Sequence, residues 1–316
     1  MQDWTTVLRT VLVSRALDAI EEMRLLPERK VLYQFCARGH DVTQVLLGQQ
    51  LTGRRDAVSP YYRSRPLALA LGVTAEEALA STMMRSEGMS GGRDVGVVIN
   101  RPNRDGPCLL PACGGVGTQY TPATGWAQAL RYRERVLGDD AVAGCIAVAH
   151  GGEASTSTNG FWASLNIATT ERLPLLYFIE DNGYGISVPA SRQTPGGDIA
   201  ANLAAFGNLR ILTGEGSDPV AAAALIASAV AAVRQGEGPV LLRLRVPRLS
   251  GHSGQDTQAY KLPGEIEAER ARDPLLALQR LLVPSVMAAS AWRALETEAE
   301  QAVEDALQRI ESRPQV

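Results

Sequence analysis

Residues 151–182 read GGEASTSTNGFWASLNIATTERLPLLYFIEDN. A short apolar run, CIAVA at 145–149, comes just before this stretch, and a second, LPLLYFI at 173–179, lies inside it. Between the two runs lie a glycine- and hydroxyl-rich loop with one acid, Glu153, and then a segment of helical pattern. An acidic, amide-bearing turn, Asp181-Asn182-Gly183, follows the second run. This order of strand, loop, helix, strand and turn predicts a βαβ unit.

Each predicted strand of this unit is followed by a polar cluster. Glu153 follows the first strand and Asn182 follows the second. Strands joined in this way are parallel, so we expect both clusters at the carboxyl edge of one sheet, where open α/β sheets bind ligands. Carboxylate and amide oxygens suit Mg²⁺, which takes one or two carboxylates and shares its other positions with phosphate and water. The sequence therefore predicts a magnesium-type site at this edge.

The composition is ordinary for a globular protein and excludes several classes of function. The chain has 316 residues, 45% apolar and 21% charged, enough for one large α/β domain or two smaller ones. A formal net charge of −3 gives no reason to expect nucleic-acid binding. No apolar segment reaches about 18 residues without charge, so we expect no membrane span. No signal or transit peptide is visible, and a cytoplasmic location is the simplest expectation.

The four cysteines carry no metal-type spacing. Their simplest interpretation is as small buried residues in a reducing compartment. They are Cys36, Cys108, Cys113 and Cys145.

The rest of the chain continues the alternation of helices and strands. Helices are expected at 4–26, 40–52, 74–84, 122–136, 198–206 and 218–234, and strands at 210–216 and 239–246. Thr74 and Glu77 form a capping box at the start of the third helix. Residues 86–117 have few periodic segments and are typical of a functional loop. The alternation predicts a doubly wound, mostly parallel α/β sheet over residues 1–265, with N-terminal helices, and a helical C-terminal extension over 266–316.

Several motifs carry a resemblance to a known family. Gly152-Glu153-Ala154, followed 26 residues later by Asp181-Asn182, is similar to the thiamine-diphosphate fingerprint, Gly-Asp-Gly and then Asn-Asn. The segment EDNGYGISVP at 180–189 resembles alpha subunits of 2-oxoacid dehydrogenases, the decarboxylating components of the pyruvate and branched-chain complexes. Other segments follow that family's order between about residues 10 and 281: Ala37-Arg-Gly-His-Asp41, Tyr61-Tyr-Arg63, Ser90-Gly-Gly-Arg93, Gly117-Thr-Gln119 and Gly251-His-Ser253.

The resemblance implies a thiamine-diphosphate-binding fold and a set of cofactor residues. Magnesium is expected on Glu153, on the Asn182 side chain and on the Tyr184 carbonyl, where the ion bridges the diphosphate. The residues expected around the cofactor are Tyr62, Arg63, Gly114, Val116, Gly152, Ala154, Ser155 and His252. Without the family, the simplest interpretation of residues 61–63 is a surface strand end. A potassium ion is expected, in some members of the family, near Cys113, Thr118 and Gln119.

Among the three histidines, His252 is the expected catalytic residue. It follows a predicted strand in a polar loop, where the family places an active-site histidine that contacts the cofactor phosphate and assists acyl transfer to a lipoyl group. Ser253 matches a serine that is phosphorylated in eukaryotic relatives, although regulation is not implied here. His40 and His150 are expected to be structural, although His150 borders the loop after its strand.

Two departures from the fingerprint keep an alternative open. Ala154 replaces a glycine, which costs little only where φ is negative, and Asp181 replaces an asparagine. A non-catalytic subunit that has lost metal and cofactor binding is therefore a second hypothesis. An ordinary nucleotide-binding protein is a third, but it predicts a G-x-G-x-x-G after a first strand, and none occurs in that context. Within the enzyme class, acetoin cleavage is the alternative to 2-oxoacid decarboxylation, and branched-chain substrates are favoured over pyruvate.

The resemblance also implies partners. In this family the acid that activates the cofactor comes from a beta subunit, and no candidate for it occurs in this sequence. We therefore expect a beta subunit in an α2β2 assembly, a lipoyl-bearing acyltransferase and a small 2-oxo acid as partners. The polar tail that ends in ESRPQV would also suit the linker of an alpha–beta fusion.

Overall fold

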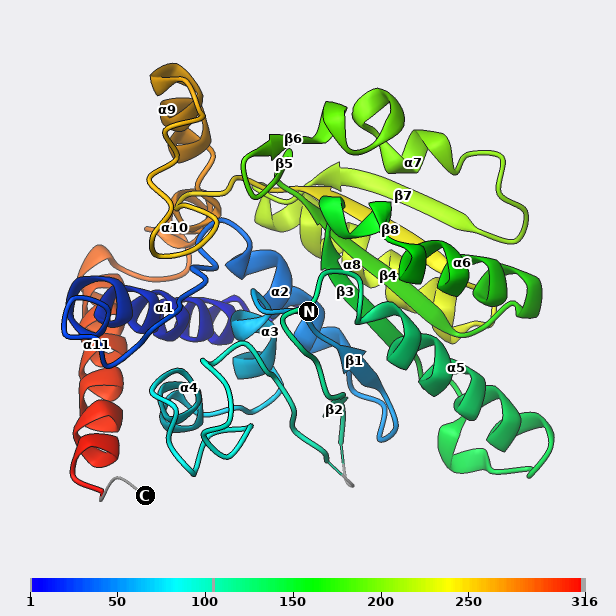
Figure 1. Cartoon of the computed structure of the whole chain (residues 1–316), viewed down its shortest axis with the longest axis horizontal. Helices are drawn as coiled ribbons and strands as arrows, with labels where there is room; N and C mark the ends of the chain where they lie inside the picture. Colours follow the sequence, from blue (N-terminus) through cyan, green and yellow to red (C-terminus); the bar gives the residue numbers. More distant parts are fainter. Residues whose placement is uncertain (1, 104–105, 314–316) are drawn as a thin grey trace.

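The computed structural model describes residues 2–103 and 106–313, so that residues 314–316 of the predicted C-terminal extension lie outside it (Figure 1). Its centre is a parallel sheet of six strands in the order β2-β1-β3-β4-β8-β7. The strands are β1 (Ala57–Ser59), β2 (Cys108–Leu109), β3 (Ala147–Gly152), β4 (Leu175–Asp181), β7 (Arg210–Glu215) and β8 (Val240–Arg245). The predicted parallel sheet is confirmed.

The βαβ unit predicted from residues 145–182 is present. β3 ends in a short 3-10 turn over Glu153–Ser157, and α6 (Asn159–Glu171) then crosses to β4. Thr158 caps α6 by accepting from the Phe161 N–H, and Arg172 ends it in a left-handed conformation. β3 and β4 pair in register from Ala147 opposite Leu175 to Gly152 opposite Glu180. The loops after Gly152 and Asp181 therefore leave the same edge of the sheet.

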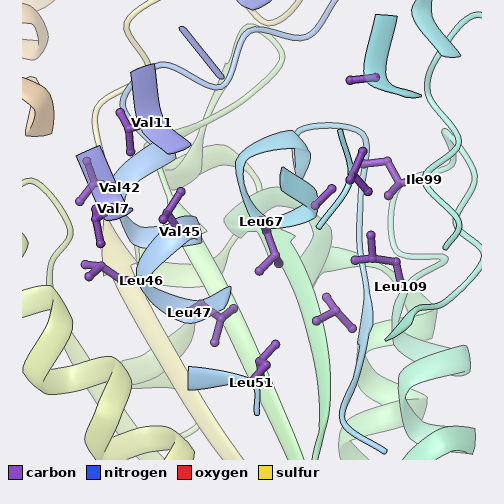
Figure 2. Close-up of a cluster of buried hydrophobic side chains, with 14 of the residues drawn as sticks. Val7, Val11, Val42, Val45, Leu46, Leu47, Leu51, Leu67, Ile99 and Leu109 are labelled. Atoms are coloured by element: carbon purple, nitrogen blue, oxygen red, sulfur yellow. The ribbon is translucent and has the colours of Figure 1, made fainter. Parts of the chain in front are cut away.

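Helices cover both faces of the sheet, as a doubly wound fold requires. One face packs on α2 (Asp41–Gln50) and α8 (Pro219–Arg234), and the other on α5 (Tyr120–Arg135) and α6. Successive residues of β3 point to opposite sides, so that Val148 joins the first cluster and Ala147 and Ala149 join the second. In Figure 2, apolar side chains of α1, α2 and α3 (Arg65–Ala70) gather in the first cluster with Ile99 and Leu109.

The two ends of the chain pack together. α1 (Trp4–Ile20) continues as a short π-helix to Leu25, and α11 (Ala289–Glu311) lies beside it in Figure 1. Trp292, Val303, Leu307 and Ile310 of α11 are buried in the same cluster as the sheet strands. The boundary expected near residue 265 stays a prediction.

Residues 266–316 contain more than one helix. α9 (Pro263–Ala271) and α10 (Pro274–Leu282) precede α11, and each of these two helices begins with a proline at its first turn. Figure 1 shows α9 standing away from the sheet, and none of its residues is buried.

Most predicted helices are confirmed, including the capping box of Thr74 and Glu77 at the start of α4 (Ala75–Thr82). α7 (Ile199–Asn202) is shorter than the helix expected at 198–206. The sequence missed α3, β1, β2 and the hairpin of β5 (Tyr184–Gly185) with β6 (Val188–Pro189). These elements have two to six residues, which is too short for a periodic pattern to emerge.

Charged residues in the second half of α1 and just after it pair with neighbouring helices. Asp18 and the adjoining Glu21 are buried and form ion pairs with Arg65. Arg15 forms ion pairs with Asp41 at the start of α2 and with Asp273 before α10. These charges connect α1 to the helices around it.

The strand order reverses between β1 and β3. The chain leaves β1 towards β2 on one side and leaves β3 towards β4 on the other side. Such a reversal opens a crevice at the carboxyl ends of the two strands, where α/β proteins bind their ligands. In the part of the chain that the structure describes, no helix is long and apolar enough to cross a membrane.

We predict that Trp292→Ala lowers the free energy of unfolding of the whole fold by about 3–5 kcal/mol, because it removes a buried indole from the shared core. Urea denaturation followed by far-UV circular dichroism measures the change. Arg293→Ala, at an exposed neighbouring position of α11, is the control and should change it by less than about 0.5 kcal/mol. An unchanged main transition in Trp292→Ala would show that the C-terminal helices fold apart from the sheet.

Candidate functional site

A cleft of about 500 Å³ opens at the carboxyl edge of the sheet, at the reversal between β1 and β3. It is lined by the segments that follow β1, β3, β4 and β8 and by the glycine-rich loop before α5. The predicted site residues that line it are Tyr62, Arg63, Gly114, Val116, Gln119, Gly152, Ala154, Ser155, Asn182, Tyr184 and His252. Segments almost 200 residues apart in sequence, as the resemblance implied, thus meet in one cavity. Glu153, Cys113 and Thr118 do not line it.

Two buried arginines give the cleft a positive wall. Arg63 donates from Nη1 to the carbonyl of Cys36 and from Nη2 to the carbonyl of His252 at 3.0 Å. Arg248 donates from Nη2 to the Tyr260 hydroxyl, and its buried Nε has no hydrogen-bond partner in the described part of the chain. Among the described residues, neither guanidinium forms a salt bridge with a carboxylate. Charges buried without an opposite charge are costly, so the cleft is suited to an anion.

Residues 61–63 are therefore not a surface strand end. Tyr61 and Arg63 are buried, and the Tyr62 ring packs 4.1 Å from the Phe35 ring, centroid to centroid. The segment turns sharply after β1 because the Tyr61 N–H donates to Ser64 Oγ at 2.9 Å. That turn brings Arg63 to the floor of the cleft.

His252 is held at the cleft by its backbone. Its N–H donates to Asp256 Oδ2 at 2.6 Å, and its ring packs edge-on against Phe35 and Tyr62. Burial lowers the pKa of His252 to about 4, and the charges of Arg63 and Arg248 act in the same direction. The imidazole is therefore neutral at pH 7 and can donate from one nitrogen and accept at the other.

Glu153 lies just behind the cleft wall, with 2% of its surface exposed. Its Oε1 accepts from the Thr194 hydroxyl, while its buried Oε2 has no hydrogen-bond partner among the described residues. Burial raises the pKa of this carboxyl, and the nearby Asp181 charge raises it further. The hydrogen bond from Thr194 lowers this pKa, but the net pKa is raised. A cation beside Oε2 would satisfy the free oxygen and favour the ionised form.

The turn after β4 carries the second predicted metal ligand, the Asn182 side chain, which lines the cleft. Asn182 Oδ1 accepts from the Tyr184 N–H at 3.1 Å, and its Nδ2 lies 3.1 Å from His40 Nε2. Burial lowers the pKa of His40 to about 3, so its ring is neutral. Clusters of three or more His, Cys, Asp or Glu side chains suited to a metal are absent from the described residues. The predicted set is not of that kind, because it consists of one carboxylate, one amide and one carbonyl.

The two departures from the fingerprint have structural explanations. Asp181 does not line the cleft. Its carboxylate pairs with Arg243, whose Nε lies 2.7 Å from Asp181 Oδ2. The other oxygen of this carboxylate, Oδ1, accepts from the Gly183 N–H. Its extra negative charge is therefore neutralised. Ala154 does not have a positive φ. An alanine at this position therefore carries no left-handed strain.

The glycine-rich loop before α5 closes the cleft on one side. Gly117 has a φ of +87°, and a Cβ there would lie 2.2 Å from the Thr158 hydroxyl, so the loop passes α6 closely only as glycine. Cys113, unlike the other three cysteines, is exposed, and its thiol donates to the Thr118 hydroxyl at 3.4 Å. Thr118 in turn donates to the Gly115 carbonyl at 2.8 Å. The potassium site in this loop stays a prediction.

Glu180 is the centre of a fully buried polar network beneath the cleft. Its Oε1 accepts from Thr43 Oγ1 at 2.6 Å, and its Oε2 accepts from Gln44 Nε2 at 2.8 Å. His150 Nε2 lies 3.0 Å from Oε2, and the Tyr61 hydroxyl donates to the same oxygen at 3.4 Å. Burial acts to raise the pKa of Glu180, but the interactions with His150, His40 and Thr43 together outweigh it, so that the net pKa is lowered.

The sequence missed Arg248 and Glu180. Arg248 was visible only as part of a basic cluster at 243–248, and the signal that could have identified it is its position four residues before His252. Glu180 stands in the resembling segment next to Asp181, but no pattern marks its partners. Ile186, at the tip of the β5–β6 hairpin, also lines the cleft and has a φ of 56°, a strained conformation for a β-branched residue.

Comparison with known proteins agrees with this geometry. Residues 9–316 match the family described as "Dehydrogenase E1 component". The chain is 30% identical to the 2-oxoisovalerate dehydrogenase subunit alpha of Bacillus subtilis (strain 168), over 89% of this chain and 82% of that subunit. It is 27% identical to the chloroplastic pyruvate dehydrogenase E1 component subunit alpha-3 of Oryza sativa subsp. japonica, over 84% of this chain and 62% of that subunit. A pyruvate dehydrogenase E1 component subunit alpha of Rhizobium meliloti (strain 1021) is 30% identical over 73% of this chain and 64% of its own length. The chain thus spans less than two thirds of both pyruvate dehydrogenase subunits.

We predict that Glu180→Gln lowers the free energy of unfolding by about 2 kcal/mol at pH 7, because it replaces a buried, hydrogen-bonded charge. The folded-state pKa of Glu180 lies below its ordinary value of 4.5, so the ionised group stabilises the fold above that pH. Its contribution is lost as the pH falls through the folded pKa, and the difference between variant and parent should shrink below about pH 4.5. Urea denaturation at pH 7 and pH 4 measures it, with the exposed Glu237→Gln as control. A difference that grows at low pH would contradict the prediction.

Proposed function

Since the chain belongs to the dehydrogenase E1 component family, we propose that it is the alpha subunit of a 2-oxoacid dehydrogenase that uses thiamine diphosphate and Mg²⁺. One observation carries the proposal. The cleft is lined by two buried guanidiniums that form no salt bridge within the described chain, and the neighbouring Glu153, just behind the lining residues, has a buried carboxylate oxygen that lacks a partner there. An anion and a cation bound together would satisfy both walls, and a metal diphosphate is such a ligand.

Glu153 Oε2, Asn182 Oδ1 and the Tyr184 carbonyl would hold the metal. They are hard oxygen ligands, and a single carboxylate leaves positions for diphosphate oxygens and water, as Mg²⁺ prefers. The free Oε2 of Glu153 is the observation that supports the fit. The metal role of these three residues remains a proposal.

Arg63 and Arg248 would bind the diphosphate from the opposite wall. A guanidinium presents paired donors that match phosphate oxygens, and burial strengthens the interaction. Tyr62 also lines the cleft, with its ring against His252, and backbone amides of residues 152–155 lie at the start of the 3-10 turn after β3. The charge of the ligand would offset the repulsion between the two arginines.

Thiamine diphosphate, when bound, would supply the nucleophile and the electron sink that loss of carbon dioxide from a 2-oxo acid requires. His252 would contribute a neutral imidazole at the cleft, able to donate a hydrogen bond to an oxygen of the substrate from one nitrogen and to accept a proton at the other. Val116 and Ile186 form an exposed apolar rim. Together with the Phe35 ring, this rim would exclude water from the reacting carbon.

The apolar lining favours a branched-chain 2-oxo acid over pyruvate. Tyr33, Phe35, Val95, Val97 and Ile186 offer an aliphatic chain more contact than a methyl group could use. The similarity to the 2-oxoisovalerate dehydrogenase subunit of Bacillus subtilis also favours a branched-chain substrate. Acetoin cleavage would use the same residues and is the second candidate reaction.

A beta subunit would complete the active site. The described residues of the cleft include no carboxylate placed to activate an aminopyrimidine, because Glu153 lies behind the wall and Asp181 is paired with Arg243. We therefore propose an α2β2 assembly that passes its acyl group to a lipoyl-bearing acyltransferase, in the cytoplasm. The pairing of Asp181 and the backbone of Ala154 weaken the alternative of a non-catalytic subunit.

We expect the chain alone to be inactive and the chain with its beta subunit to decarboxylate 2-oxoisovalerate more efficiently than pyruvate or acetoin. The measurement is kcat/KM for each substrate with ferricyanide as electron acceptor. Full turnover by a preparation free of beta subunit would overturn the partner requirement. Absence of cofactor binding by the assembly, in calorimetric titration with thiamine diphosphate and Mg²⁺, would favour the non-catalytic alternative.

We predict that Arg248→Met weakens the binding of thiamine diphosphate to the assembly at least tenfold, because it removes a buried charge that faces the diphosphate, an interaction of about 1.5–3 kcal/mol. Isothermal titration calorimetry gives the dissociation constant. Arg210→Met, which removes an exposed arginine paired with Glu237, is the matched control and should leave it unchanged. An unchanged dissociation constant in Arg248→Met would show that Arg248 does not bind the cofactor.

A further inference from the structure

His40 is buried, but its ring contacts the side chain of a proposed metal ligand, Asn182. It immediately precedes α2, it is fully buried, and its Nε2 lies 3.1 Å from Asn182 Nδ2, a contact across 142 residues of sequence. We propose that His40 is a positioning residue that sets the orientation of the Asn182 amide, so that Oδ1 is presented to the metal. This inference rests on the proposed function, because it requires Asn182 to be a metal ligand.

The hydrogen bonds around Asn182 determine which atom of the amide faces which neighbour. The Tyr184 N–H, 3.1 Å away, can only donate, so the amide atom that faces it is the oxygen. The other amide atom, Nδ2, can only donate, so His40 Nε2 must accept from it. The single proton of the neutral ring is therefore on Nδ1.

His40 Nδ1 shows that this arrangement has a cost. It is buried and has no hydrogen-bond partner among the described residues. A buried N–H without a partner is unfavourable, and in the opposite tautomer Nε2 would present a proton to another donor. The ring therefore keeps the hydrogen bond to Asn182 while its Nδ1 stays without a partner among the described residues, as expected if the orientation of that amide is the property that matters.

The amide of asparagine needs such a partner because its terminal torsion has two nearly equivalent orientations. In one, Oδ1 is available to a cation, and in the other, two N–H donors would repel it. An acceptor that faces Nδ2 favours the first orientation before the metal arrives. Partners of this kind, behind a metal ligand, typically contribute 10- to 100-fold to metal affinity.

His40 is itself held in place relative to Asn182. Thr43 Oγ1 lies 2.8 Å from the His40 carbonyl and 2.6 Å from Glu180 Oε1, so that both acceptors face one hydroxyl, and Glu180 is two residues before Asn182. Gly39 fixes the other side, because its φ is +94° and a Cβ there would lie 2.0 Å from the Pro247 carbonyl. His40 and Asn182 are therefore joined through the sheet as one rigid unit.

The test compares His40→Leu, which removes the acceptor, with His40→Gln, whose Oε1 can accept from Nδ2. Binding of Mn²⁺ to the assembly of the full chain with its beta subunit, at saturating thiamine diphosphate, is measured by electron paramagnetic resonance. We expect about tenfold weaker binding in His40→Leu and recovery to within about threefold of the parent in His40→Gln. Val45→Ala is the control: it removes buried volume from α2 without a change at Asn182, and it should lower the melting temperature but leave Mn²⁺ affinity unchanged.

Each outcome decides the question. Parental Mn²⁺ affinity in His40→Leu, or an equal loss in Val45→Ala, overturns the role of His40 and leaves the proposed function intact. The same loss in His40→Gln as in His40→Leu also overturns it, because the acceptor would then be irrelevant. An unsubstituted assembly that binds no Mn²⁺ in the presence of thiamine diphosphate overturns the proposed function and this inference together.

Discussion

A single buried carboxylate, Glu180, organises the site. It sits in a central strand with no exposure to solvent, so its charge must be satisfied entirely by the protein. Its partners come from α2, from the segment after β1 and from β3, and each stands beside a segment that lines the cleft. The positions of residues 61–63, 150–155 and 180–184 are thus coupled through one group. The cleft is a rigid arrangement built on the sheet rather than an assembly of independent loops.

Positive side chains line the cleft, while the carboxylates close to it are paired or buried. Carboxylates close to it are paired or buried, as Asp181 with Arg243 and Glu153 behind the wall. The guanidiniums of Arg63 and Arg248 face the cavity without such partners among the described residues. The cleft is therefore positive although the whole chain is slightly acidic, at −3. Net charge describes the surface of a protein, while the local arrangement of buried ions determines what its cleft binds.

The sequence predicted the elements and site residues that carry a local pattern or a family motif, and it did not predict those that depend on contacts in three dimensions. The βαβ unit was predicted because its apolar runs and its helix are long enough to show their period, and the residues of the cleft were found through motifs that occur in a family's order. β1 and β2 escaped because two or three residues carry no period, although the reversal beside β1 opens the cleft. Arg248 and Glu180 were missed for a different reason. Their importance lies in contacts across many residues of chain, which no local pattern encodes.

The unsatisfied oxygen of Glu153 has a consequence for the life of the protein in the cell. A buried carboxylate oxygen without a partner destabilises the unliganded chain, and a ligand that binds only the folded state stabilises it in proportion to the logarithm of its concentration. Local opening around residues 152–157 should thus be more frequent in the unloaded subunit, and that opening exposes backbone to proteases. The supply of vitamin and metal would then set the abundance of the subunit as well as its activity, because unloaded copies are degraded first.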